Sequence, residues 1–369
     1  GRLVSDEMLS TVPKDVQEMW KLLDTTIDYK FYKNDKKRVV NEYNNIIEFG
    51  WGGLHGAPKG VYERHNVKLL DVRSMYPNIL IALNGLGEKT PYYKKIMEKR
   101  FEYKRKGNNP KMDKAYKLIL NTTYGLLNNK YSRLDRPSLA YSICIYGQIS
   151  LYQLTKALTN VGCRVFNINT DGVAFEPDKA EKWKIVWEEW EREFPLELDL
   201  EEYEYWRQKD VNNYVAVTYD GDIKVKGGDV NKYKHNDGLY FRNYNTRIID
   251  IAIVEKIVND KDIADTIVEN LDKPILYQYV LQRGNTYKGT FDNKGNQLQK
   301  INRVFAAKDS GYEIFKKRQD GGLVKFADAP KNMHLFNGDL EDFTEFREII
   351  DIDWYYQLAT HNYNRWKVR

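Results

Sequence analysis

Cysteines and long apolar runs are both scarce in this sequence. Only two of its 369 residues are cysteines, Cys144 and Cys163. Thiolates therefore cannot build a zinc cluster, and we expect a reduced, intracellular protein. No apolar run approaches the ~20 residues that span a bilayer, and the N-terminus has no signal-peptide pattern. Together with the lack of repeats and low-complexity tracts, these absences favour a globular chain with no membrane partner.

Charge is unevenly distributed along an otherwise ordinary composition, with 42% hydrophobic and 30% charged residues and a net charge of +5. Residues 89–136 contain 14 Lys or Arg against 4 Asp or Glu, whereas residues 176–204 contain 12 acids against 4 bases. A basic block followed by an acidic one predicts a polyanionic partner on one face. Many of the 28 tyrosines adjoin Lys, Arg or Asn, a mixture that suits nucleic-acid binding.

The stretch from Asp71 to Pro77 carries the strongest local signal. Apolar residues 67–72 predict a buried strand, in which the Asp71 carboxylate needs a cation or hydrogen bonds to balance it. Pro77 suits the first turn of a helix, so Ser74 to Tyr76 should form a tight strand-to-helix corner. Backbone N–H groups at such a corner can seat a phosphate beside the acid. The alternative is that Asp71 is only a helix cap.

Two basic helices are predicted after this corner, over about 90–106 and 111–127, joined by a Gly-Asn-Asn-Pro turn. Each has polar side chains four residues apart on one face. These are Arg100 and Lys104 on the first helix, and Lys117 and Asn121 on the second. Facing one another across a helical hairpin, they could clamp a triphosphate; otherwise they form a solvated charged surface.

A second acid, Asp171, is predicted at the tip of a β-hairpin that covers residues 163–175. An Asp-Gly turn with no catalytic role is the alternative there. Gly50-Trp51-Gly52-Gly53 predicts either a backbone approaching another segment closely or a simple turn. The remaining elements follow from hydrophobic periodicity. They are a helical lead-in before residue 50, helices over about 137–161 and 178–194, strands at 196–206, 213–219 and 222–228, and helices near 243–260 and 261–271.

In this order, the motifs resemble those of family B DNA polymerases of the bacteriophage kind. Residues 71–77 are similar to the first palm motif, D-x-x-S-L-Y-P, and residues 117–125 resemble the fingers motif K-x-x-x-N-S-x-Y-G. Residues 169–172 resemble the second palm motif, D-T-D-S, and residues 50–53 are similar to the glycine motif that precedes the palm. The resemblance covers about residues 50–228.

The resemblance implies an α+β fold with right-hand polymerase architecture: an antiparallel-sheet palm, a helical-hairpin fingers subdomain and a mixed thumb. The implied boundaries are a lead-in at 1–49, palm at 50–88 and 137–228, fingers at 89–136, and thumb at 229–369. The implied enzyme is a DNA-directed DNA polymerase. It would add dNTPs to a primer 3′-OH by two-metal-ion nucleotidyl transfer, in phage DNA replication in the host cytoplasm.

The resemblance also assigns roles to individual residues. Asp71 and Asp171 would be catalytic and, with Val72, would bind two Mg²⁺ ions, for which Mn²⁺ could substitute. Tyr76 would exclude a ribose 2′-OH, and Tyr124 would pack beside it against the nascent base pair. The other nucleotide-binding residues would be Ser74, Met75, Arg100, Lys104, Lys117 and Asn121. Primer-template DNA would contact Gly52, Gly53, Tyr214, Lys224 and Lys226. The expected partners are DNA, dNTPs and replication accessory proteins, bound by a monomer.

Some features depart from the family pattern. Asn169 stands where the second palm motif has its first acid, and Asn213 stands where lysine usually precedes Tyr214. Only about fifty residues precede the glycine motif, so no exonuclease domain and no proofreading are expected of this chain. The short spacing between Pro77 and Lys117 leaves little room for the insertion of protein-primed members, and a nucleic-acid primer is therefore expected.

Other functions share parts of this pattern. A primase-like or RNA-templated polymerase has similar palm chemistry, although Tyr76 argues against ribonucleotides. A catalytically weakened, DNA-binding polymerase remnant would explain Asn169, but the combined presence of Asp71, Lys117 and Asp171 argues against it. A structural interaction module would rest on the acidic block alone.

Overall fold

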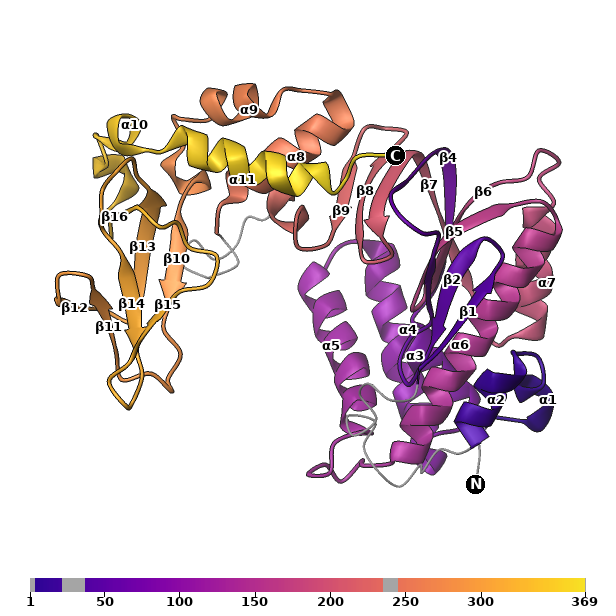
Figure 1. The fold of residues 1–369 in the computed structure, drawn as a ribbon. Helices are drawn as coiled ribbons and strands as arrows, with labels where there is room; N and C mark the ends of the chain where they lie inside the picture. The colour runs from indigo at the N-terminus through magenta and orange to yellow at the C-terminus, as the bar shows by residue number, and fades with distance from the viewer. Residues whose placement is uncertain (1–3, 22–36, 235–244, 369) are drawn as a thin grey trace. The chain divides into compact units, whose positions relative to one another are not determined.

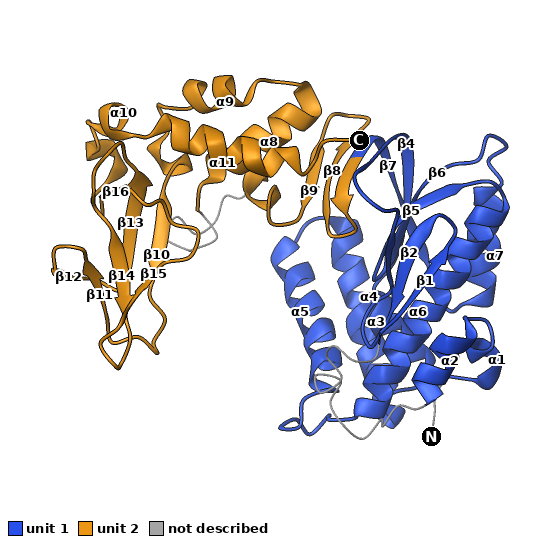
Figure 2. Ribbon diagram, viewed as in Figure 1, with its two compact units in different colours: residues 1–206 blue, residues 207–369 orange. Residues whose placement is uncertain are grey.

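The computed structural model describes residues 4–21, 37–234 and 245–368. The chain forms two compact units, Gly1–Trp206 and Arg207–Arg369, which are described separately (Figure 2). Among the described residues, no helix combines the length and the hydrophobicity needed to cross a membrane. Helices and mainly antiparallel sheets occur in both units, so the predicted α+β class is confirmed.

Unit 1 combines a sheet with a helical layer (Figure 1). Its helices are α1 (Asp6–Leu9), α2 (Lys14–Lys21), α3 (Met75–Ala82), α4 (Thr90–Lys106), α5 (Pro110–Leu126), α6 (Pro137–Asn160) and α7 (Trp183–Glu193), with a 3₁₀ turn at Gly87–Lys89. Its strands are β1 (Arg38–Glu42), β2 (Asn45–Phe49), β3 (His55–Ala57), β4 (Tyr62–Val72), β5 (Arg164–Asn169), β6 (Gly172–Glu176) and β7 (Leu198–Asp210), the last of which crosses the unit boundary.

The sheet of unit 1 has the strand order β1-β2-β3-β5-β6-β4-β7. Strand β4 pairs antiparallel with β6, and β5 pairs with both β3 and β6. The two segments that the motifs single out, β4 and the β5–β6 hairpin, are thus central neighbours although they are far apart in the sequence. Their ladder hydrogen bonds set the relative position of the acids at their ends.

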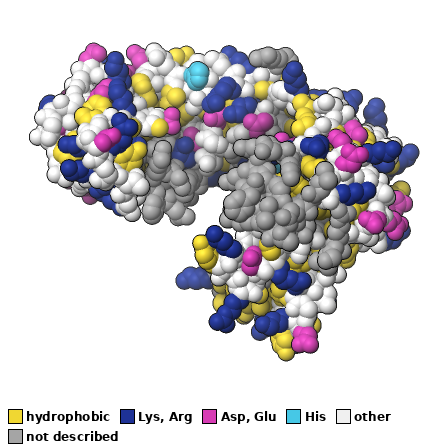
Figure 3. Space-filling view, turned by 60° about the horizontal axis from the view of Figure 1, so that its bottom comes forward, with side chains coloured by type: hydrophobic (Ala, Val, Ile, Leu, Met, Phe, Trp, Pro, Cys, Tyr) yellow, Lys and Arg dark blue, Asp and Glu magenta, His cyan; other side chains and the backbone are white. Residues whose placement is uncertain are grey.

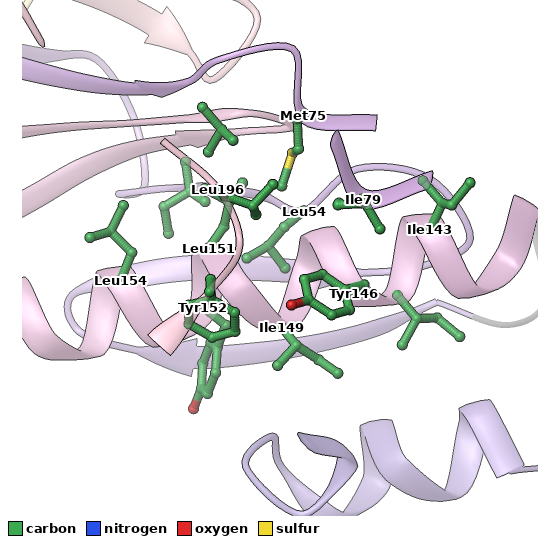
Figure 4. Packing of buried hydrophobic residues seen from close by; sticks show 14 of the residues in the cluster. Leu54, Met75, Ile79, Ile143, Tyr146, Ile149, Leu151, Tyr152, Leu154 and Leu196 are labelled. Carbon is green, nitrogen blue, oxygen red and sulfur yellow. The ribbon is translucent and has the colours of Figure 1, made fainter. Parts of the chain in front are cut away.

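Helix α6 is the main support of this sheet. It begins at Pro137, whose fixed φ suits a first helical turn, and it packs on β5, β6, α3 and α7. Its apolar residues continue around much of the helix, which is typical of a buried helix. Figure 4 shows Ile143, Tyr146 and Ile149 of α6 among buried side chains that include Met75 and Ile79 of α3.

The predicted helical lead-in is only partly correct. Helices α1 and α2 lie in it, but residues 38–49 form the β1–β2 hairpin, and residues 22–36 lie outside the described part. Tyr43 and Asn44 make its turn with φ values of 54° and 59°. Such φ values define the tight hairpin turns that match strand twist. The Lys- and Asn-rich composition made the alternation of more and less buried residues along β1 and β2 hard to recognise in the sequence.

The two basic helices lie close to their predicted bounds. Helix α4 ends at Gly107, which adopts φ 63°, and α5 starts at Pro110 after the N-cap Asn109. The Asn109 side chain accepts a hydrogen bond from the N–H of Met112. Glycine after the last turn and proline in the first turn are strong local stop and start signals. The helices pack against each other as the predicted hairpin.

In its described residues, unit 2 contains three antiparallel β-structures and a helical cluster. Its strands are β8 (Asn213–Thr218), β9 (Ile223–Lys226), β10 (Tyr279–Gln282), β11 (Gly289–Asp292), β12 (Gln297–Leu298), β13 (Ile301–Ala306), β14 (Ile314–Lys317), β15 (Leu323–Lys325) and β16 (Met333–Leu335). Its helices are α8 (Arg247–Asn259), α9 (Ile263–Glu269), α10 (Phe346–Ile349) and α11 (Ile352–Asn364), with 3₁₀ turns at Asn231–Lys234, Pro274–Leu276 and Leu340–Asp342. Within the unit, β8 pairs with β9, and the sheets β10-β13-β16 and β12-β11-β14-β15 follow.

Helices α8, α9 and α11 of unit 2 pack on one another, and Tyr355 joins α11 to the β10–β13–β16 sheet. The Tyr355 hydroxyl accepts a hydrogen bond from Ala306 at 3.1 Å and donates one to the Tyr277 carbonyl at 2.6 Å. Lys and Arg side chains are spread over the face seen in Figure 3 among acidic and uncharged ones.

Candidate active site

The two predicted acids come together at the end of the β4–β6 ladder. Asp71 is paired with Gly172, and the N–H of Val72 donates to the carbonyl of Asp171 at 2.6 Å. A Cβ at Gly172 would lie 3.0 Å from Asp71 Oδ1, so glycine allows this carboxylate to lie against the hairpin backbone. Strand pairing therefore brings together the end of β4 and the turn between β5 and β6.

Asp71 lies in a strongly acidic environment. Burial and the nearby carboxylates of Asp171, Glu201 and Asp199 raise its pKa to about 7, while Lys104 acts in the opposite direction. Asp199 and Glu201 lie on β7, two residues apart and thus on the same face of the strand. In the sequence they belong to the acidic block, and nothing there places them near Asp71. Their alternation along a strand was the signal that could have identified them.

The predicted strand-to-helix corner is confirmed, and it excludes the helix-cap interpretation of Asp71. Asp71 lies within β4, and the N-cap of α3 is Ser74, which adopts φ 45° and makes no side-chain capping bond. Instead, Ser74 Oγ accepts a hydrogen bond from Arg100 Nη1 at 2.9 Å. The first N–H groups of any α-helix have no intrahelical acceptor, so the start of α3 is suited to an anion.

A cavity of about 510 Å³ connects the corner, the acids and the helical hairpin. Its lining includes the candidate residues Asp71, Val72, Ser74, Met75, Tyr76, Arg100, Lys104, Lys117, Asn121, Tyr124 and Asp171. The nearly buried Arg100 is fixed by Asp113 of α5, whose Oδ1 lies 3.1 Å from Arg100 Nε. Carboxylates and cationic side chains thus line one cavity, an arrangement that suits a metal-bound polyphosphate.

The two predicted nucleotide-contacting tyrosines form a stacked pair in the same cavity. The ring centroids of Tyr76 and Tyr124 are 4.6 Å apart, with 30° between the planes. Tyr76 comes from α3 and Tyr124 from α5, so the pair also links the corner to the hairpin. The Tyr124 hydroxyl lies 2.9 Å from the thiol of Cys144 on α6. No signal in the sequence predicts this contact.

The glycine segment lies against the hairpin turn. Thr170 donates its N–H to the Leu54 carbonyl at 2.8 Å. A Cβ at Gly53 would come within 2.5 Å of Thr170 Oγ1 and 2.8 Å of Thr170 Cα, so the predicted close backbone approach is confirmed at Gly53. At Gly52 a Cβ would meet nothing within 4 Å. Thr170 itself has φ 56°, a strained value for a β-branched residue.

The acids alone do not form a metal site. Among the residues that the structure describes, no group of three or more His, Cys, Asp or Glu side chains is placed so that it could hold a metal ion. Magnesium does not require such a group, because it commonly takes one or two protein carboxylates and substrate phosphate oxygens. Burial and the repulsion of the neighbouring carboxylates raise the pKa of Asp71, and a bound cation would offset that repulsion.

Three predicted DNA-binding residues, Tyr214, Lys224 and Lys226, belong to unit 2 rather than to this cavity. Tyr214 on β8 is paired with Lys226 on β9, and the two exposed lysines lie on one face of β9. Contact of these three residues, and of Gly52 and Gly53, with DNA stays a prediction. Asn169 is at the end of β5, paired with Gly172 and next to the turn that carries Asp171.

Comparison with known proteins gives a distant but consistent result. No protein-family profile matches the sequence. The sequence is 26% identical over 232 residues to DNA polymerase 2 of Aeropyrum pernix. The match covers 50% of this chain and 28% of that protein. The fold is similar to that of the family B DNA polymerase from Pyrobaculum calidifontis, with a TM-score of 0.52 and 15% identity. That likeness covers 96% of this chain and 51% of the archaeal one, so the chain spans about half the length of the solved structure.

Proposed function

We propose that this chain is the polymerase part of a family B DNA polymerase of the bacteriophage type, which extends a primer on a DNA template. One observation carries the proposal: Asp71 and Asp171 line the same cavity as the cationic helical hairpin. The distant similarity in sequence and fold to archaeal DNA polymerases supports the same reaction class. In this proposal residues 50–88 and 137–228 are the palm, 89–136 the fingers and 229–369 the thumb.

Asp71 and Asp171, with the Val72 carbonyl, would hold two Mg²⁺ ions, or Mn²⁺ in their place. When bound, the ions would make the primer 3′-OH more acidic and neutralise charge on the triphosphate. The protein's contribution is the rigid placement of the carboxylates by the β4–β6 ladder. Asp199 and Glu201 add negative charge that favours cation binding at Asp71.

The triphosphate would lie between the start of α3 and the helical hairpin. The N–H groups at Ser74 to Tyr76 would donate to phosphate oxygens, and Arg100, Lys104, Lys117 and Asn121 would hold the opposite side. Arg100 is the most constrained of these, because Ser74 and Asp113 already fix its guanidinium group. A preorganised cation stabilises developing charge without the cost of reorienting during the reaction.

The tyrosine pair would contact the sugar and base of the incoming nucleotide. The Tyr76 ring would lie under the deoxyribose, where a 2′-OH would clash with it, and Tyr124 would pack against the nascent base pair. Gly52, Gly53, Tyr214, Lys224 and Lys226 would contact the primer-template, largely through its phosphates. We place the protein in phage DNA replication in the host cytoplasm, as a monomer working with accessory proteins.

Primer extension tests this proposal. The assay uses a DNA primer-template with Mg²⁺ and compares the wild type with Asp171→Asn, which removes a charge while keeping the side-chain shape. Asp220→Asn is the matched control. Asp220 also precedes a glycine in the turn between two paired strands, but it is exposed and lies in unit 2. We expect dNTP extension by wild type and Asp220→Asn, and its loss in Asp171→Asn.

The outcomes separate the competing functions. Equal extension by all three proteins would remove Asp171 from the active site. Extension with rNTPs as efficient as with dNTPs would favour a primase-like enzyme. DNA binding without extension by the wild type would favour a polymerase remnant, for which the specific support is Asn169 in place of the usual acid.

A further inference from the structure

Cys144 contacts the tyrosine pair from α6. It is only 5% exposed, and its thiol is hydrogen-bonded to the hydroxyl group of Tyr124, whose ring is stacked on that of Tyr76. The sulfur lies 2.9 Å from Tyr124 Oη. Burial raises the pKa of the thiol to about 11, so the group is a neutral S–H at physiological pH. A neutral thiol can either donate or accept a hydrogen bond, so it can pair with a phenol hydroxyl.

The same face of α6 also contacts the strand-to-helix corner. Gly147 is three residues after Cys144, and a Cβ at this glycine would lie 2.9 Å from the terminal methyl of Met75. Residues three apart share a helix face. Helix α6 thus contacts α3 through Gly147 and holds the Tyr124 hydroxyl through Cys144. The stacked ring of Tyr76 is therefore supported by a helix that lies outside the resembling motifs.

We propose that Cys144 is a positioning residue that fixes the Tyr76–Tyr124 pair and thereby determines how strongly the site rejects a ribose 2′-OH. This inference rests on the proposed function, because it concerns the nucleotide selected at the same cavity. A steric barrier excludes a hydroxyl only if the ring cannot move aside. Anchoring of the Tyr124 hydroxyl, together with the stacking of Tyr76 on Tyr124, supplies that resistance. Cys144 is not among the residues that line the cavity, so its effect passes through the two tyrosines.

Three substitutions separate hydrogen bonding from packing. Cys144→Val fills the buried space with a slightly larger apolar side chain and removes the hydrogen bond, Cys144→Ala also leaves a cavity, and Cys144→Ser restores a group that donates and accepts. Cys163→Val is the matched control. Cys163 is the other buried free cysteine, 4% exposed, and its thiol hydrogen-bonds to Asp178 rather than to the tyrosines.

The measurement is kcat and KM for dATP and for ATP in single-nucleotide primer extension. For Cys144→Val we expect about a tenfold loss of discrimination, the factor that corresponds to one lost hydrogen bond. The change should appear as a lower KM for ATP, with kcat for dATP within about twofold of wild type. Cys144→Ser should recover most of the discrimination, and Cys163→Val should leave it unchanged.

Wild-type discrimination in Cys144→Val would overturn the inference, as would an equal loss in Cys144→Ser. Equilibrium binding of dATP and ATP to a complex with a 3′-dideoxy-terminated primer gives a second readout that needs no chemistry. If the wild type binds dATP in preference to ATP without extending primers, the proposed function fails and the Cys144 variants still test the positioning role. If the wild type binds both sugars equally, the inference is overturned.

Discussion

At the scale of single residues, Arg100 has the most defined geometry of the predicted triphosphate ligands. Its guanidinium bridges Ser74 Oγ on the corner and Asp113 on α5, with side-chain exposure of 12%. A planar group with several fixed donors can do this while still presenting an N–H to a phosphate. Lysine carries the same charge but cannot maintain the bridging geometry.

We predict that Arg100→Lys raises KM for dNTPs by about 10-fold, and that Arg100→Ala raises it by about 100-fold, in line with the loss of charge-assisted hydrogen bonds. Single-nucleotide extension kinetics measure both. Lys106→Ala is the control, because Lys106 is an exposed base of the same helix that pairs with Glu102. A KM for Arg100→Ala that matches the control would remove Arg100 from triphosphate binding.

The two acids of the candidate site were predictable from sequence, whereas the residues that support them were not. Asp71 and Asp171 adjoin strong local signals, a buried strand before a proline and a hairpin turn. Cys144, Asp199 and Glu201 act through contacts between segments far apart in the chain. Composition and periodicity do not indicate which distant segments come into contact. In the sequence, Cys144 was therefore only a core cysteine, and Asp199 and Glu201 were only part of an acidic block.

At the scale of elements, close contact between the glycine segment and the β5–β6 turn positions Asp171. Alanine at Gly53 would place its Cβ against Thr170 backbone, which cannot move without shifting the turn. We predict that Gly53→Ala lowers primer extension about 100-fold, the scale expected when a reacting group is misplaced by about 1 Å. Gly52→Ala, with open space at its Cβ, leaves the turn in place and should lower primer extension far less than Gly53→Ala. Equal rates in the two variants would contradict this role for the contact.

A second contact anchors the start of the glycine segment to α6. Gln148 accepts a hydrogen bond from the Gly50 N–H at 3.0 Å and donates one to the Gly50 carbonyl at 2.9 Å. Both residues are buried, so removing the amide leaves polar backbone groups short of partners.

We therefore predict that Gln148→Leu lowers the Tm of the protein by on the order of 5 °C. Differential scanning calorimetry measures this shift. Gln153→Leu is the control, because Gln153 is on the same helix but makes its hydrogen bond to Thr11 in an exposed setting. Similar Tm values for the two variants would show that the Gly50 bond adds no stability.

Local signals decided which elements were predictable. The bounds of α4, α5 and α6 follow from prolines at their starts and, for α4, from Gly107 at its end. Helix α7 starts at Trp183, later than predicted, because Asp178 accepts hydrogen bonds from the N–H groups of Lys182 and Trp183 instead of entering the helix. The β1–β2 hairpin was missed because its polar composition hides the alternation, and its strand β2 also pairs with β3 outside the hairpin.

At the scale of the whole molecule, the division into two units was only partly visible in the sequence. The length predicted several domains, and the motif-based boundary placed residues 207–228 with the palm. By its internal contacts, the chain divides within β7, after Trp206, and β8 and β9 group with the C-terminal unit. A continuous strand gives no compositional break, so neither glycine, proline nor charge marks this point. The assignment of these strands to the palm stays a prediction.

Unit 2 contains its own buried acid, which couples its stability to pH. Asp250 on α8 is 2% exposed and accepts a hydrogen bond from the Lys232 N–H at 2.9 Å, while Lys232 Nζ lies 3.5 Å away. Burial raises the pKa of Asp250 to about 7; the charge of Lys232 opposes this shift, and that of Asp229 adds to it. The folded state thus binds a proton that the unfolded chain, with an ordinary Asp pKa of about 4, has already released.

The sign of the pH effect follows from this difference. A raised folded-state pKa contributes stability that is complete below about pH 4 and is lost as the pH rises through about 7, at up to about 1.4 kcal/mol per pH unit. Asp250→Asn keeps an acceptor for the Lys232 N–H but cannot ionise, so it should remove this part of the pH dependence. Hydrogen exchange of α8 peptides between about pH 5 and 8, corrected for intrinsic rates, reports on unit 2 alone. Asp309→Asn, at an exposed unit 2 residue whose φ of 46° asparagine tolerates, should keep the wild-type profile, whereas a profile for Asp250→Asn as steep as the wild type would place the titrating group elsewhere.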